Sequence, residues 1–73
     1  MLHPFQIERI ISLGGGFSLD ASKYLPNQLE RFAAFAAQSE ATLILNNCNY
    51  LLPNQLERIA AFGKGKVVFK MEK

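Results

Sequence analysis

The sequence has one cysteine, one histidine and almost no excess of charge of either sign. Cys48 has no second cysteine to pair with, so a disulfide within the chain is excluded and the thiol could pair only with another molecule. Eight basic and six acidic residues leave a net charge of +2, which is too small to indicate a nucleic-acid or membrane partner without a local cluster.

Long apolar runs are also missing. None approaches the roughly 18 residues that a membrane-spanning helix needs. Residues 1–11 lack the basic start and the apolar segment of a signal peptide. We therefore expect a cytoplasmic protein, or a piece of a larger one, without a membrane partner.

The length of 73 residues and the hydrophobic share of 49% are those of one globular domain. A chain of this size buries only about 60% of the surface that its unfolded form exposes. Such chains usually need a covalent staple, a metal or a partner to be stable. We expect a single domain over residues 1–73 with a small margin of stability.

A ten-residue segment occurs twice with one difference. PNQLERFAAF occupies residues 26–35, PNQLERIAAF occupies residues 53–62, and residues 4–10 keep the proline, the glutamine and the Glu-Arg pair at the same spacing. Copies separated by 20 to 50 residues are typical of stacked supersecondary units. The near identity is also typical of a recent duplication, or of a designed or excised repeat segment.

Each copy predicts a helix, near residues 4–13, 26–38 and 53–62. In the third copy Leu56, Ile59 and Ala60 fall on one face, which is the apolar stripe of a helix that covers a core. Two helix starts are possible there: Asn54 with Glu57 resembles a capping box, or Pro53 occupies the first helical position. The same alternatives apply to the second copy.

A short alternating segment follows each helix and predicts strands near residues 17–20, 42–46 and 66–71. Strands joined through helices must be parallel, and such crossovers are almost always right-handed. The sequence therefore predicts an α/β fold of the order αβαβαβ, with a three-stranded parallel sheet and helices on one face.

The segment Leu43-Ile44-Leu45-Asn46-Asn47-Cys48 matches the L-x-L-x-x-[NC] strand and turn of a leucine-rich repeat. Together with the helix that follows, it resembles the cysteine-containing class of that family. Residues 17–22 are similar, with Ser22 in the place of the Asn or Cys. The resemblance covers about residues 17–71 and implies a curved α/β solenoid whose exposed sheet face usually binds a protein.

The face of the predicted sheet opposite the helices is the candidate binding site. Purely parallel sheets are normally covered on both faces, and the open edge of a sheet is a template for pairing with another chain. We therefore expect a non-catalytic interaction or self-assembling module that binds a second copy of itself or another protein. The exposed-face residues are Ser18, Asp20, Ile44, Asn46, Val68 and Lys70.

No catalytic, cofactor or metal constellation is found. His3 is far from Cys48 in the sequence, and no second cysteine supplies a zinc pair. Gly14 to Gly16 leave a predicted helix and enter a strand, whereas a phosphate-binding loop runs the other way. We expect no enzyme activity, and we expect Cys48 at an inward turn position with its thiol on a backbone group.

Two charge patterns have both a structural and a functional interpretation. The Glu-Arg pairs of the three copies indicate a solvated helix face, with ladders between adjacent helices as one arrangement. The four lysines at 64, 66, 70 and 73 suggest nucleic-acid binding as the alternative function. We prefer helix capping and protection of an edge strand as the role of these lysines. Phe69 is the only aromatic residue interleaved among them that could stack on a base.

Overall fold

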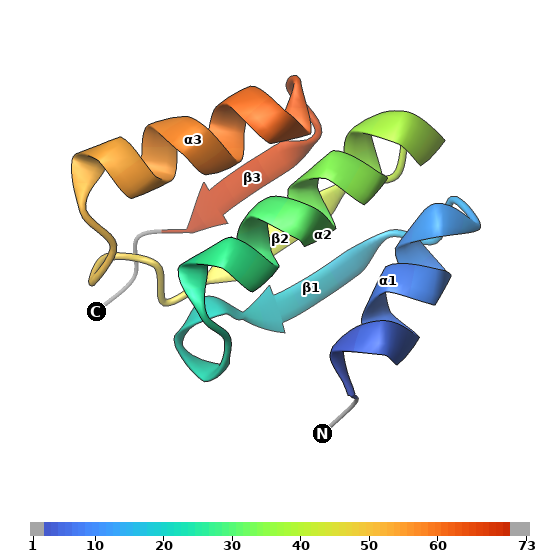
Figure 1. Cartoon of the computed structure of the whole chain (residues 1–73), viewed down its shortest axis with the longest axis horizontal. Coiled ribbons are helices and arrows are strands. Elements are labelled where there is room, and N and C mark those ends of the chain that lie inside the picture. Colours follow the sequence, from blue (N-terminus) through green and yellow to red (C-terminus); the bar gives the residue numbers. More distant parts are fainter. Residues whose placement is uncertain (1–2, 71–73) are drawn as a thin grey trace.

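The structure is a computed structural model and describes residues 3–70. The elements, in chain order, are α1 (Pro4–Ser12), β1 (Phe17–Asp20), the 3₁₀ helix η1 (Ala21–Lys23), α2 (Pro26–Ser39), β2 (Leu43–Asn46), α3 (Pro53–Gly63) and β3 (Val67–Lys70). The strands form one parallel sheet in the order β1-β2-β3, and the helices lie side by side over one of its faces (Figure 1). The predicted α/β class and the three-stranded parallel sheet are confirmed.

The element boundaries differ from the predicted ones by about one residue. α2 continues to Ser39 because Glu40 supplies the left-handed conformation that ends it, with φ of 60°. β2 and β3 each begin one residue later than expected, since the residue before each strand contributes only a carbonyl that accepts a hydrogen bond from the neighbouring strand. The predicted end of the third strand, at residue 71, lies outside the described residues.

The three helices begin in the same way, with proline at the first helical position. The third helical residue is always glutamine, and its side-chain oxygen accepts a hydrogen bond from the backbone N–H of the residue before the helix. These pairs, at 2.8 to 2.9 Å, are Gln6 with His3, Gln28 with Leu25, and Gln55 with Leu52. The alternative with proline first is confirmed, and the Asn-Glu capping box is wrong because glutamine supplies the acceptor.

The core lies between the helix layer and the sheet. Phe32 of α2 is fully buried, as are Leu43 and Leu45 of β2, and the Tyr24 ring meets Phe32 edge to face with centroids 5.5 Å apart. Burial of a side chain of this size contributes about 1.5 to 3 kcal/mol. The middle helix and the middle strand therefore supply the centre of the core.

Candidate interaction surfaces

The six predicted site residues form two rows across the sheet. The pairing register aligns Ser18, Ile44 and Val68 in one row, and Asp20, Asn46 and Lys70 in the next. Along each strand their side chains alternate with less exposed ones, so they lie on the face opposite the helices. Neighbouring strands are about 4.8 Å apart, so each row is a continuous strip.

The row of Ser18, Ile44 and Val68 has an apolar centre. The side chain of Val68 is 44% exposed, and Ile44 beside it is partly exposed. A face with water on one side normally carries polar groups at such positions. Ile44 and Val68 therefore make an apolar strip on the sheet face that the three helices leave open.

The second row begins with an acidic group and ends with a basic one. Asp20 accepts hydrogen bonds from the hydroxyl of Ser22 at 2.5 Å and from its backbone N–H at 2.9 Å, and these bonds lower the pKa of Asp20. Asn46, in the middle, donates to the Ser18 hydroxyl at 2.9 Å and to the Leu19 carbonyl at 3.2 Å. The exposed Lys70 lies at the other end of the row.

Cys48 occupies the turn after β2 and is fully buried. Its Sγ lies 3.4 Å from the Leu45 carbonyl and 3.3 Å from the Lys70 carbonyl, so it donates to backbone acceptors. Burial raises the pKa of this thiol. The predicted inward position of Cys48 is confirmed, and the site favours the protonated thiol over the thiolate.

Within residues 3–70, the C-terminal lysines lie on different elements. Lys64 follows the end of α3, whereas Lys70 ends β3, and Lys73 lies outside the described residues. Four residues of strand, at about 3.3 Å each, separate Lys66 from Lys70. The Lys66 ammonium also lies 4.0 Å from Glu40. Lys70 therefore lies at the opposite end of β3 from Lys64 and Lys66.

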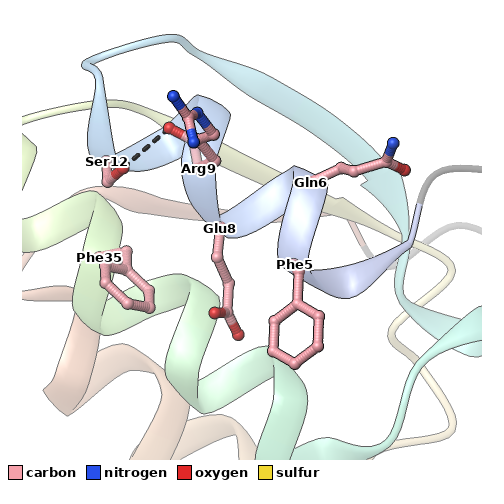
Figure 2. Close-up of a pocket in the computed structure, with 6 residues that line it drawn as sticks. All are labelled: Phe5, Gln6, Glu8, Arg9, Ser12 and Phe35. Atoms are coloured by element: carbon pink, nitrogen blue, oxygen red, sulfur yellow. Dashed lines mark hydrogen bonds between the residues drawn. The ribbon is translucent and has the colours of Figure 1, made fainter.

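The outer surface of the helix layer carries two equivalent grooves. The groove between α1 and α2 has a volume of about 450 Å³ and is lined by residues that include Phe5, Glu8, Arg9 and Phe35. Figure 2 shows the rings of Phe5 and Phe35 on either side of the Glu8 carboxylate. The groove between α2 and α3, of about 290 Å³, is lined by the corresponding residues of the next copies.

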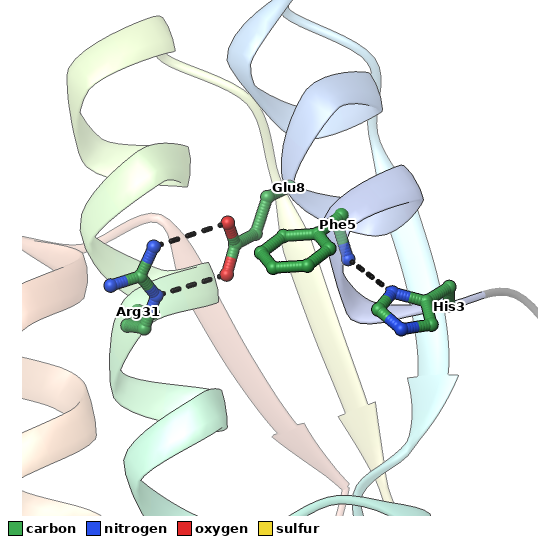
Figure 3. Close-up of polar contacts among 4 residues, drawn as sticks. All are labelled: His3, Phe5, Glu8 and Arg31. Carbon is green, nitrogen blue, oxygen red and sulfur yellow. Dashed lines mark hydrogen bonds and ion pairs between the residues drawn. The ribbon is translucent and has the colours of Figure 1, made fainter.

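Ion pairs join neighbouring helices across these grooves. Arg31 of α2 donates two hydrogen bonds to Glu8 of α1, at 3.0 and 3.3 Å (Figure 3). Arg58 of α3 contacts Glu30 of α2 in the same way, at 3.2 and 3.3 Å. The bonds to Glu8 and its negative charge raise the pKa of Arg31. The predicted ladder between adjacent helices is confirmed.

Tyr50 makes a contact that no sequence pattern predicted. Its hydroxyl donates to the carbonyl of Ala21 at 2.7 Å, which ties the loop before α3 to η1. Burial, followed by the charges of Cys48 and Asp20, raises the pKa of Tyr50. This hydrogen bond holds the loops together at the carboxyl ends of β1 and β2, next to the row that starts with Asp20.

No family model matches the chain, and neither a curated protein nor a solved structure matches it. Of the helices within residues 3–70, none has both the length and the apolar character required to cross a membrane. The same residues contain no group of three His, Cys, Asp or Glu side chains arranged to hold a metal ion.

Proposed function

We propose that the chain is a non-catalytic protein–protein interaction module, a short leucine-rich-repeat-like stack whose bare sheet face binds a second copy of the same chain. The apolar strip of Ile44 and Val68 is the observation that carries the proposal. Burial of such a strip against another protein is favourable because apolar surface leaves water.

The charges of the neighbouring row support a second copy as the partner. The row runs from Asp20 through Asn46 to Lys70. A two-fold axis parallel to the strands, between two facing sheets, places Asp20 of each copy opposite Lys70 of the other. The same axis places Ile44 opposite Ile44. The charges of this face are thus complementary to those of the same face in a second copy, as a symmetric (isologous) interface requires.

The sequence resemblance gives the same face the same role. Residues 43–48 match the strand and turn of a cysteine-containing leucine-rich repeat, and Cys48 lies buried at the turn where that pattern places it. The resemblance implies that the sheet face opposite the helices binds protein. Ser18, Asp20, Ile44, Asn46, Val68 and Lys70 are therefore proposed as the contact residues.

Equilibrium sedimentation over a hundredfold dilution tests the proposal, with circular dichroism at each concentration to follow folding. The unaltered chain should associate as its concentration rises. Ile44→Lys should weaken association by about tenfold or more, because the two-fold contact brings the introduced ammonium groups together. Gln38→Lys is the matched control, since it adds the same charge to the exposed surface of α2. Equal, purely monomeric behaviour of the three proteins would rule the proposal out.

A further inference from the structure

Within residues 3–70, no helix lies on the outer side of α1, whereas α2 and α3 each have a preceding helix beside them. This N-terminal end face consists of Ile10, Leu13 and Arg9, and the Arg9 side chain also lines the groove between α1 and α2. Ile10 corresponds in the sequence copies to Phe32, which is fully buried, yet Ile10 is 37% exposed and Leu13 is 78% exposed. The residue of α2 that corresponds to Leu13 is Phe35, which lines the groove against α1. The N-terminal end face is thus the side on which a preceding helix would lie.

On the opposite side of the molecule, no described helix follows α3. This C-terminal end face consists of Leu56, Glu57 and Ala60 of α3. The corresponding residues of α2 are Leu29, Glu30 and Ala33, and α3 lies beside them. Leu29 and Ala33 are fully buried, whereas Leu56 is partly buried and Ala60 is exposed. The C-terminal end face is thus the side on which a following helix would lie.

The two end faces carry opposite charges at matching places. In both ion pairs of the ladder, a glutamate of one helix accepts from an arginine of the next helix. Within residues 3–70 the side chains left without such a pair are Arg9 at the first helix and Glu57 at the last. A following helix would need an arginine for Glu57, and α1 of another copy presents Arg9 in that position.

The open strands show the same complementarity. β1 and β3 form the two edges of the sheet (Figure 1). Continuing the register beyond β3 places Phe17 of a second copy beside Val67, and Asp20 of that copy beside Lys70. Opposite charges directly across neighbouring strands are favourable by about 0.2 to 1 kcal/mol. Lys70 therefore discourages an arbitrary strand at this edge but suits β1.

We infer that copies of this chain stack head to tail, with α1 and β1 of one copy continuing the helix row and the sheet beyond α3 and β3 of another. The inference rests on the proposed self-association and adds a second contact to the two-fold one. The C-terminal end face of one copy meets the N-terminal end face of the next, and Glu57 accepts from Arg9. Because the two faces differ, the contact leaves a free face at each end and the stack stays open to further copies.

Charge reversal at the two ends tests the contact. In Arg9→Glu the head-to-tail contact brings two carboxylates together, and in Glu57→Arg it brings two guanidinium groups together. Each variant alone should self-associate about tenfold more weakly than the unaltered chain. A mixture of the two variants restores opposite charges in both orders of stacking, and so does the double variant R9E/E57R within a single sequence.

The readout is the dissociation constant from fluorescence transfer between labelled copies, for each variant alone, for the mixture and for the double variant. The two-fold contact is the same in every combination of variants. An affinity about tenfold higher in the mixture than in either single variant therefore measures the head-to-tail contact. If the unaltered chain associates but both single variants and the mixture bind equally well, the head-to-tail contact is wrong and the proposed function stands. If the unaltered chain stays monomeric throughout, the proposed function fails as well.

Discussion

The middle helix and the last helix contain almost the same ten residues, yet they bury them differently. Leu29 and Leu56 occupy the same place in the segment PNQLER, and Leu29 is fully buried whereas Leu56 is only partly buried. Likewise, Ala33 is fully buried and the corresponding Ala60 is exposed. Local sequence cannot cause this difference, because it is shared. Among the described elements, α2 has a helix on each side and α3 has a helix on one side, and this difference decides how much apolar surface leaves water.

The largest effect is expected when the leucine side chain is truncated to alanine at both positions. Leu29→Ala should lower the free energy of unfolding by about 2 to 5 kcal/mol, as for other fully buried leucines. Leu56→Ala should lower it by about 1 to 2 kcal/mol, because part of that side chain is already in water. Urea denaturation followed by circular dichroism, at a concentration where the chain is monomeric, measures both values. Equal losses would show that neighbouring helices do not control burial.

The turns after β1 and β2 also contain corresponding residues that differ in burial, and here the side chains are polar. Ser22 and Cys48 occupy corresponding positions, but Ser22 is exposed and donates to Asp20, whereas Cys48 is buried against the Lys70 carbonyl of β3. Burial raises the pKa of the Cys48 thiol above its ordinary value of 9.0. As the pH rises, the unfolded chain releases this proton before the folded chain does.

Stability should therefore be fully present below pH 9 and should fall as the pH rises from 9.0 through the pKa of the folded state. For one thiol the slope has an upper limit of about 1.4 kcal/mol per pH unit, reached where only the unfolded thiol is ionised. Cys48→Ala should reduce this decrease, and Tyr50→Phe measures the separate part that Tyr50 contributes, because burial raises the pKa of Tyr50 as well. Urea denaturation between pH 7 and 10 measures the slopes. An unchanged slope in Cys48→Ala would contradict the assignment.

Features that depend on neighbouring residues could be predicted from the sequence. The spacing of Leu56, Ile59 and Ala60 predicted a helix, and the alternation around Ile44 predicted a strand, because each pattern matches the period of one regular element. The helices between the strands then predicted that the three strands are parallel, as they are in the structure. The usual burial of a free cysteine was enough to predict the inward position of Cys48.

Features that depend on distant residues were not predictable in the same way. One local feature was also left open: Asn27 and Gln28 are both capable of capping the second helix, and the extended backbone of Leu25 presents its N–H to Gln28. The hydrogen bond from Tyr50 to Ala21 joins loops that are 29 residues apart. The pairing of each glutamate with the next arginine, and therefore the unmatched state of Arg9 and Glu57, requires the order of helices in space.

The smallest effect concerns the charges of the two nearly identical helices. Glu30 accepts two hydrogen bonds from Arg58 with its side chain only 18% exposed, whereas Glu57 has no ion-pair partner among the described residues. Glu30→Gln should therefore lower the free energy of unfolding by about 0.5 to 1 kcal/mol, and Glu57→Gln should leave it almost unchanged.

The Glu30→Gln loss should shrink in 1 M salt, where the screening length falls to about 3 Å. A double-mutant cycle with Arg58→Gln separates the pair energy from other effects of Glu30, and Arg9→Gln is the control for an arginine without a partner. Urea denaturation of the monomeric chain, at low and high salt, supplies each value. A loss at Glu57 as large as that at Glu30 would mean that helix-wide electrostatics, and not the contact with the next helix, determines the contribution of these glutamates.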